Sequence, residues 1–244
     1  MRVQRGLRAG CLTAAVALAA LCAASTLPAG AAPSARTLYR EALATTDEWS
    51  VHYASGGTIA KVPILESGDA GPASGVQEVL VGRGTTIDIA ELIVIGDITY
   101  VKGNARALQD LIFLSPSQAA ASAGKWILFS TDNPTFSQVV VGIRSRDVAK
   151  ELVMKGPFTL GRKRRIDGIE VDAIRGTQDL PGLKPMRAVL YVRADGAHRV
   201  VEEDTLNAKG KPNGIEHTIY SDWGETVRPS APQASLSIGK VSGI

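Results

Sequence analysis

Three histidines are the side chains in this 244-residue chain that most readily bind a metal or move a proton near neutral pH. His52 and His217 lie in segments that alternate as strands do, and His198 follows the turn at Asp195. A metal site or a catalytic triad needs its members to converge, and nothing in this spacing brings the three together. The sequence therefore predicts no metal ligand, no cofactor and no catalytic histidine.

The short motifs that mark common enzymes are missing from the chain. Residues 71–75 (GPASG) have the wrong spacing for a nucleophile elbow, and residues 82–84 (GRG) are typical of a hairpin turn rather than a phosphate-binding loop. Asp167 and Asp195 each precede a glycine in a turn, so they do not indicate a pair of catalytic carboxylates. We therefore expect a protein with no catalytic residues that is not an enzyme.

Residues 162–165 (RKRR) form a basic run that has three interpretations. A hairpin at the Asp-Gly turn that follows would set Lys163 opposite Asp172 and Arg165 opposite Glu170, which would explain the charges structurally. Transient contact with anionic headgroups at a membrane surface, or binding to nucleic acid, are the alternatives. The pairing in register favours the structural interpretation.

The first 31 residues have the composition of a secretory signal peptide. Three arginines without an acid come first, residues 11–25 are uncharged and rich in Ala and Leu, and residues 29–31 (AGA) match an A-x-A cleavage site. Cleavage after Ala31 would export the chain across the cytoplasmic membrane, so that it is secreted or stays in the cell envelope. A retained N-terminal anchor is the alternative.

Both cysteines lie in this N-terminal segment. Leu21 precedes Cys22, whereas an acylated cysteine normally follows Gly, Ala or Ser, so a lipid anchor at Cys22 is disfavoured. The predicted mature chain then has no cysteine, hence no disulfide and no thiolate metal site. Without the three N-terminal arginines, the 27 basic residues fall to 24 and equal the 24 acidic residues. This balance disfavours a nucleic-acid partner.

The hydrophobic pattern predicts an α+β chain with a mostly antiparallel sheet. Strand-like runs follow one another rather than alternating with helices, and we expect about nine strands with three or four helices. The predicted helices occupy residues 37–46, 104–112, 116–123 and 136–155. Residues 63–75 are predicted to form a loop. We expect a single domain over residues 32–229 and a flexible tail over residues 230–244.

A Gly-Asp turn at residues 96–97 predicts a tight hairpin. Pairing Ile95 with Ile98 places Glu91 opposite Lys102 and gathers apolar side chains on one side of the strands. This isoleucine face consists of Ile87, Ile89, Ile93, Ile95, Ile98 and Tyr100. Such a surface must be covered, and the segments 104–123 and 136–155 are the available covers.

Several strings, in their order along the chain, resemble the actinobacterial LppX/LprG-type envelope proteins of the LolA/LolB-like superfamily. They are residues 76–89 (VQEVLVGRGTTIDI), 95–102 (IGDITYVK), 124–129 (GKWILF), 166–171 (IDGIEV), 190–201 (LYVRADGAHRVV) and 218–229 (TIYSDWGETVRP). The resemblance implies a curved antiparallel sheet, about half a barrel, with helices in its concave side and an apolar cavity between them. It also implies a carrier of lipids, lipoglycans or lipoproteins in the envelope. Separately from the resemblance, an envelope transporter is a partner that we expect for a protein-interaction surface on this sheet.

The residues themselves leave two outcomes open for the space beside the isoleucine face. The segment 119–124 is rich in Ala, Ser and Gly and fills little volume, so a cavity for acyl chains can remain between sheet and helices. Larger side chains from loops could instead fill the space as ordinary core. We therefore expect the isoleucine face to bind acyl lipid. A protein-interaction module on the same fold is the alternative function.

Overall fold

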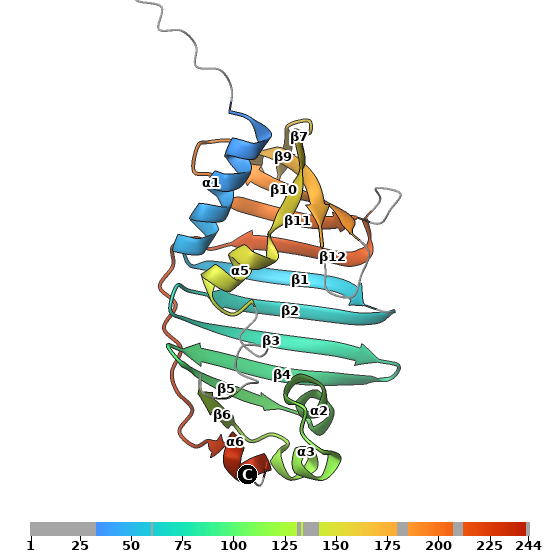
Figure 1. Cartoon of the computed structure of the whole chain (residues 1–244), viewed down its shortest axis with the longest axis vertical. Helices are drawn as coiled ribbons and strands as arrows, with labels where there is room; N and C mark the ends of the chain where they lie inside the picture. Colours follow the sequence, from blue (N-terminus) through green and yellow to red (C-terminus); the bar gives the residue numbers. More distant parts are fainter. Residues whose placement is uncertain are drawn as a thin grey trace, which may run out of the picture. The chain divides into compact units, whose positions relative to one another are not determined.

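One curved sheet organises the described part of the chain (Figure 1). The computed structural model describes residues 33–59, 61–130, 133, 142–179, 185–206 and 212–242. Its strands are β1 (Val51–Ile59), β2 (Val62–Ala70), β3 (Ser74–Arg83), β4 (Thr86–Ile95), β5 (Ile98–Gly103), β6 (Ile127–Ser130), β7 (Met154–Leu160), β8 (Arg164–Ile166), β9 (Ile169–Gln178), β10 (Met186–Arg193), β11 (Val200–Leu206), β12 (Pro212–Ser221) and β13 (Leu236–Ser237). Its helices are α1 (Ala35–Glu48), α2 (Ala105–Ile112), α3 (Pro116–Ser122), α5 (Ser145–Glu151) and α6 (Ile238–Ser242).

The strands run in the order β13-β6-β5-β4-β3-β2-β1-β12-β11-β10-β9-β7, and β8 also pairs with β9. Most neighbours in this order are also neighbours along the chain. The exception at the centre is β1, which pairs with β2 on one side and with β12 on the other. Only β13 with β6 is a parallel pair among these strands. The predicted α+β class with a curved, mostly antiparallel sheet is confirmed.

Local sequence signals explain where three helices begin. The side chain of Ser34 accepts a hydrogen bond from the backbone N–H of Thr37 at 3.2 Å and caps α1, and Asn104 caps α2 in the same way. Ser115 and Gln118 form a reciprocal capping box at α3, with a proline in the first turn. These caps satisfy backbone donors that have no partner within the helix.

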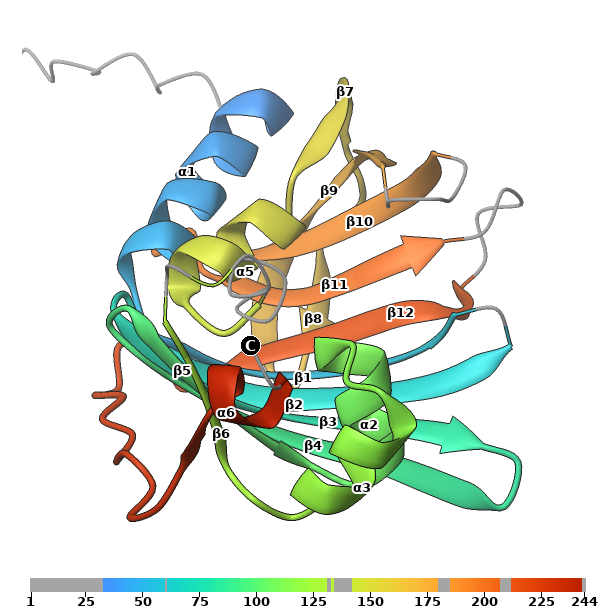
Figure 2. The same ribbon diagram turned by 60° about the horizontal axis from the view of Figure 1, so that its bottom comes forward.

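The helices lie on the inner side of the curved sheet, as Figure 2 shows. One apolar cluster joins α1 and α5 to strands around β9, β10 and β1, and it includes Leu38, Leu152 and Leu190. A second cluster joins α2 and α3 to β4, β5 and β6, and it includes Leu92, Leu108 and Phe129. Each helix therefore buries an apolar stripe against one end of the concave face. The expectation that helices pack in the concave side is confirmed.

Two predicted loop or helix segments have a different structure. Most of the predicted loop at residues 63–75 is the strand β2, which lies in the middle of the sheet between β1 and β3. The helix predicted over residues 136–155 is confirmed only as α5, because the chain already enters β7 at Met154. Residues 136–141 of that prediction lie outside the described residues.

The C-terminal segment differs from the flexible tail that we expected after Pro229. Leu236 and Ser237 form β13 beside β6, where the N–H of Leu236 donates to the carbonyl of Trp126 at 2.8 Å. The following helix α6 packs Ile238 and Val241 against the second apolar cluster. The alternating apolar residues of this short stretch therefore cover the edge of β6.

Hydropathy gives one further fact about the described helices. None of them combines the length and the apolar composition that a membrane-spanning helix needs. The predicted signal peptide, residues 1–31, lies outside the described residues.

Candidate functional site

The isoleucine face has the strand pairing that the sequence predicted. Ile95 lies opposite Ile98 and Ile93 opposite Tyr100. Lys102 donates to the carboxylate of Glu91 at 2.6 Å across the same two strands. The Gly-Asp turn therefore sets the register of β4 and β5 as its type requires.

The described helices cover the other side of this hairpin. Ala90, Leu92 and Val94 point to α2 and the second apolar cluster, whereas Ile87 is 59 % and Ile89 is 42 % exposed. Ile98 is exposed at 37 %, Ile93 and Ile95 are partly buried, and Tyr100 is buried. The expectation that helices cover the isoleucine face is wrong. Both sides of these strands are apolar, so alternation did not reveal which side faces the core.

The outer side therefore carries the six residues that we expected to bind lipid. Ile93 borders a hollow of about 410 Å³ there, which His52, Glu78, Glu91 and Trp126 also line. Charged and polar side chains therefore lie beside Ile93 on this side, together with the apolar Val76 and Trp126. Lipid binding by the isoleucine face stays a prediction.

A band of polar side chains crosses the concave face between the two apolar clusters. Directly opposed residues of an antiparallel pair share a side of the sheet. Pairing therefore sets Glu203 beside Thr218, Thr218 beside Ser55, and Ser55 beside Glu66, across four strands from β11 to β2. In the next row, Tyr220 pairs with Tyr53, which pairs with Gly68, which pairs with Gln77.

Hydrogen bonds join the members of this band. Ser55 donates to the carboxylate of Glu216 at 3.2 Å, and Thr218 donates to Ser55 at 3.1 Å. The amide of Gln77 donates to Glu66 at 3.4 Å. On β11, Glu203 accepts a bond of 3.1 Å from Gln178 and one of 3.4 Å from Tyr220.

Glu151, at the end of α5, lies over the same band. Its two carboxylate oxygens are 3.1 and 3.2 Å from where a side chain on Gly142 would begin, and the Gln77 amide nitrogen is 3.5 Å from that point. Its backbone carbonyl accepts a bond of 2.7 Å from Gln178. Helix and sheet thus bring Glu66, Glu151, Glu203 and Glu216 together, and we call these four residues the carboxylate cluster.

Burial raises the pKa of every member of the carboxylate cluster. It raises the pKa of Glu66 to about 7, with the charge of Glu216 adding to the effect. It raises the pKa of Glu151 to about 8, and the charges of Glu66, Glu216 and Asp147 raise it further. Glu151 is still accessible to water. Its neighbours therefore reduce the hydration of its carboxylate without enclosing the side chain. These values place proton exchange of Glu66 and Glu151 near neutral pH.

The other two members differ in their hydrogen bonding. Burial raises the pKa of Glu203 well above its ordinary range, and donors from Tyr220 and Gln178 oppose that shift only in part. Burial also raises the pKa of Glu216, against the donor from Ser55. The buried Glu203 is thus a satisfied part of the core network, whereas Glu66, Glu151 and Glu216 keep some exposure on the concave side.

Tyr53 contributes a polar atom that the fold leaves without a partner. The residue is only 5 % exposed, and its hydroxyl makes no hydrogen bond in the described structure. The ring extends over Gly68, where the hydroxyl is 2.8 Å from the position of an added Cβ. Burial and the nearby charges of Glu66 and Glu151 raise the pKa of Tyr53 well above 10, against an opposing effect of the neighbouring Gln77 amide. The hydroxyl therefore lies beside the carboxylate cluster, while the amide of neighbouring Gln77 is directed to Glu66.

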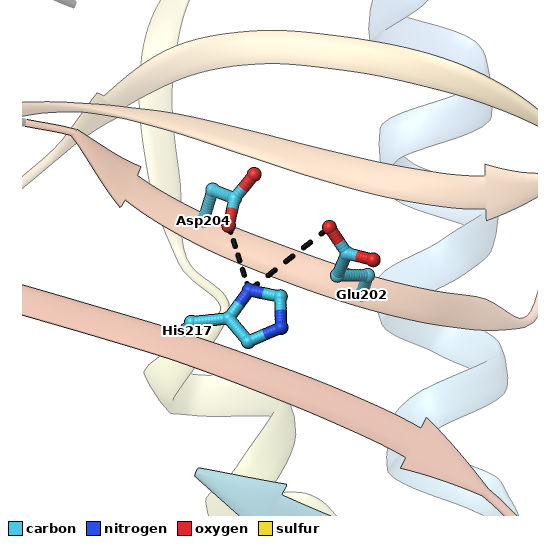
Figure 3. A group of neighbouring side chains, drawn as sticks. All are labelled: Glu202, Asp204 and His217. Carbon is cyan, nitrogen blue, oxygen red and sulfur yellow. Dashed lines mark hydrogen bonds and ion pairs between the residues drawn. The ribbon is translucent and has the colours of Figure 1, made fainter. Parts of the chain in front are cut away.

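A second group of chemistry-bearing side chains lies on the outer side of β11 and β12 (Figure 3). The Nδ1 atom of His217 is 2.8 Å from Asp204 and 4.0 Å from Glu202. This donor set could hold a metal ion, although Arg164 already pairs with Glu202 at 2.5 Å and stacks over Tyr191. The arrangement is therefore explained as an ion-pair network around Glu202.

The basic run at residues 162–165 belongs in part to this network. Arg165 pairs with Glu170 across the predicted hairpin, and Lys163 lies 3.2 Å from Glu170 and 3.9 Å from Asp172. The predicted hairpin register is confirmed, and Lys163 forms ion pairs across it as the structural interpretation requires. The ion pair of Arg164 with Glu202 was not predicted.

Comparison with solved structures shows which fold this is. Across 81 % of this chain and 96 % of the other, the structure aligns with LprF from Mycobacterium bovis at 17 % sequence identity and a TM-score of 0.53. The chain has the fold of LprF. The LprF-like fold agrees with the resemblance that the sequence strings indicated.

Two other structures align with lower TM-scores. Lipoprotein LppX from Mycobacterium tuberculosis aligns at 20 % identity over 80 % of this chain and 97 % of its own, with a TM-score of 0.46. A LolA superfamily protein from Nitrosomonas europaea aligns at 12 % identity over 81 % and 96 %, with a TM-score of 0.29. No protein-family model matches the sequence, and neither does any curated protein.

Sequence reasoning did not find the carboxylate cluster. Its members come from β2, α5, β11 and β12, and Ser55 and Glu216 lie 161 positions apart in the chain. One signal in the sequence could have indicated the cluster: Glu66 is an acid at an inward position of β2. The signal was missed because residues 63–75 were predicted to form a loop. The partners of His217 were not predicted either, because Glu202 and Asp204 come beside it only when β11 pairs with β12 in the folded sheet.

Proposed function

We propose that this protein binds acyl lipids, lipoglycans or lipoproteins on the concave side of its sheet and carries them in the cell envelope. The observation that carries the proposal is the arrangement of that side: apolar clusters at both ends, with side chains between them that stay partly accessible. Ile64 and Val81 face inward beside the polar band and are only partly buried, as is Leu111 of α2. An alkyl chain lying on these groups would gain about 25 cal/mol for each Å² of apolar surface removed from water.

The predicted signal peptide supports a place outside the cytoplasmic membrane, where a lipid carrier needs no membrane-spanning helix of its own. The LprF-like fold is consistent with this role and supplies the curved sheet. The role is binding rather than catalysis, with the lipid as the ligand and with transient contact to a membrane surface or an envelope transporter during loading. We place the acyl chain on the concave side rather than on the isoleucine face.

A pair of tryptophan substitutions separates the two faces. Ile64→Trp adds bulk on the concave side, whereas Ile93→Trp adds the same bulk to the outer side of β4. We expect Ile64→Trp to weaken binding of a fluorescent fatty-acyl probe at least tenfold and Ile93→Trp to leave it unchanged. Thermal unfolding of both variants checks that they fold. The reverse pattern would place the lipid on the isoleucine face.

Mass spectrometry of an organic extract of the purified protein is the independent test. Co-purified lipid is the expected result. A parent protein that carries no lipid and binds no acyl probe would refute the carrier.

Exposed apolar residues on the outer side favour the alternative, a protein-interaction module. Leu65 is 56 % exposed, and pairing places it in one row with Leu80 and Ile89, next to Ile87. Surface patches of this kind commonly mark contact with another protein. If the parent protein binds no acyl probe, but Ile87→Glu abolishes association with an envelope partner, this second function replaces the first.

A further inference from the structure

The three accessible members of the carboxylate cluster lie close together on the concave face. Ser55 lies between Thr218 and Glu66 in the pairing, and it donates to Glu216, so Glu66 and Glu216 face each other across β1. Glu151 approaches the same place from α5, above Gln77. The charge of each of these carboxylates raises the pKa of another member of the cluster, which is the electrostatic sign of their closeness.

No basic side chain compensates these acids in the part of the chain that the structure describes. Several acids elsewhere have cations: Glu91 pairs with Lys102, Glu202 with Arg164, and Asp88 with Arg83. The ion pairs among the described residues include none with Glu66, Glu151 or Glu216. Acids held close together without a cation repel one another.

The buried hydroxyl of Tyr53 indicates independently that a ligand belongs here. A buried polar atom without a partner costs free energy, and native structures seldom keep one without a reason. This hydroxyl lies beside Glu66 and Glu151 and can accept a hydrogen bond. Tyr53 and the nearby carboxylates therefore offer several acceptors to a single donor group.

We propose that the concave site selects amphiphiles that carry a positively charged amino group, held by Glu66, Glu151 and Glu216, with the alkyl chain on Ile64 and Val81. This assignment rests on the proposed lipid binding and names the chemical class of the ligand. An alkylammonium head has three donors and one positive charge, so it satisfies several acceptors and reduces their mutual repulsion. A fatty-acid carboxylate would add a further negative charge to the same space.

Three ligands with the same alkyl chain test this selection: dodecylammonium, dodecanol and dodecanoate, each below its micelle concentration. We expect dodecylammonium to displace a fluorescent acyl probe at a concentration at least tenfold lower than dodecanol, and dodecanoate to be weakest. Calorimetry at pH 7 in buffers of different ionisation enthalpy should show net proton release on binding dodecylammonium and none on binding dodecanol. A bound cation lowers the pKa of nearby carboxyls, which then lose their protons.

Glu66→Gln and Glu78→Gln are the matched variants. Both residues lie on central strands, but Glu78 is exposed on the outer side. Glu66→Gln should reduce the preference for dodecylammonium over dodecanol at least fivefold, and Glu78→Gln should keep it. Because a neutral side chain relieves repulsion, Glu66→Gln is expected to fold.

The outcomes separate this inference from the proposed function. Equal displacement by all three ligands would overturn the amine selection and leave lipid binding intact. If calcium chloride alone releases the same protons and blocks dodecylammonium binding, the cluster is a metal-ion site, and the amine selection is also overturned. If no ligand displaces the probe because the parent never binds it, both the selection and the proposed function fail.

Discussion

Glu66 and Glu151 make the stability of the folded chain depend on pH. A raised pKa means that the folded state holds a proton that the unfolded state has already released. The stability from this effect is fully present below the ordinary value of 4.5 and is lost as the pH rises through about 7 for Glu66 and about 8 for Glu151. The titratable groups that face these two residues are Glu203, Glu216, Asp147, Tyr53 and Tyr220, and the two tyrosines stay neutral in this range.

We therefore expect the free energy of unfolding of the ligand-free protein to fall between pH 5 and pH 8. Glu66→Gln removes one of the titrating groups. The free energy of unfolding of this variant should therefore fall less over this range, by on the order of 2 kcal/mol. Urea unfolding at several pH values measures the difference. Glu78→Gln, on the exposed side of β3, should keep the parent slope. A Glu66→Gln variant with that same slope would contradict the assignment.

Only glycine fits at position 75, because two backbone carbonyl groups approach it closely. A Cβ atom there would lie 1.9 Å from the carbonyl oxygen of Ile143 and 2.8 Å from that of Asp69. Gly75→Ala should therefore lower the free energy of unfolding by at least about 2 kcal/mol, because neither backbone group can move aside cheaply. Gly56→Ala is the comparison, since its Cβ would meet only the flexible end of Leu65 at 3.2 Å. Equal losses in urea unfolding would show that the segment before α5 adjusts freely.

At the scale of elements, the sequence predicted hairpins well where the turn residues specify them. The Gly-Asp turn of β4 and β5 and the Asp-Gly turn of β8 and β9 each set the observed register. It missed β2 because the inward positions of this strand are Ile64, Glu66 and Gly68, which do not alternate as a core strand does. The candidate site was not predicted for the same reason. An inner face is recognised by apolar residues at alternate positions, and the polar band interrupts that alternation.

The end of the chain stabilises the edge of the sheet at β6. Ending the chain after Ser235 removes β13 and α6, together with the packing of Ile238 and Val241. We expect a loss of about 2 kcal/mol in the free energy of unfolding, since two partly buried apolar side chains return to water. Hydrogen exchange should quicken at the backbone amides of β6 but not at β7, the opposite edge of the sheet. Unchanged exchange at β6 would contradict the pairing with β13.

At the scale of the whole molecule, charge has different surroundings on the two sides of the sheet. Several acids on the outer side, such as Asp69, Glu91 and Glu202, pair with histidine, lysine or arginine, whereas the carboxylate cluster on the inner side has no such partner among the described residues. Composition could not show this, because equal numbers of acids and bases say nothing about where each side chain lies. The resemblance of ordered strings predicted the curved sheet, but the inner polar band depends on pairing across the whole fold.

The processed N-terminus is the prediction that concerns the complete chain. If residues 1–31 are a signal peptide, N-terminal sequencing of the exported protein should begin at Ala32. An intact Met1 on a protein that stays in the cytoplasm would contradict export. If mass spectrometry finds a diacylated Cys22, the exported protein is anchored to the membrane rather than free.

The pairing of β1 with β12 has a consequence for the order of assembly. Strands β1 to β6 are joined by short-range pairings, and so are β9 to β12, but the two groups meet in the sheet only where partners such as Ser55 and Thr218 are 163 positions apart. Contacts so distant in sequence form slowly. If the chain is exported as we propose, it leaves the translocation channel with its N-terminus first, and β1 lacks its second neighbour until almost the entire polypeptide has emerged. During that interval, a chaperone outside the cytoplasmic membrane would bind at the exposed edge of β1.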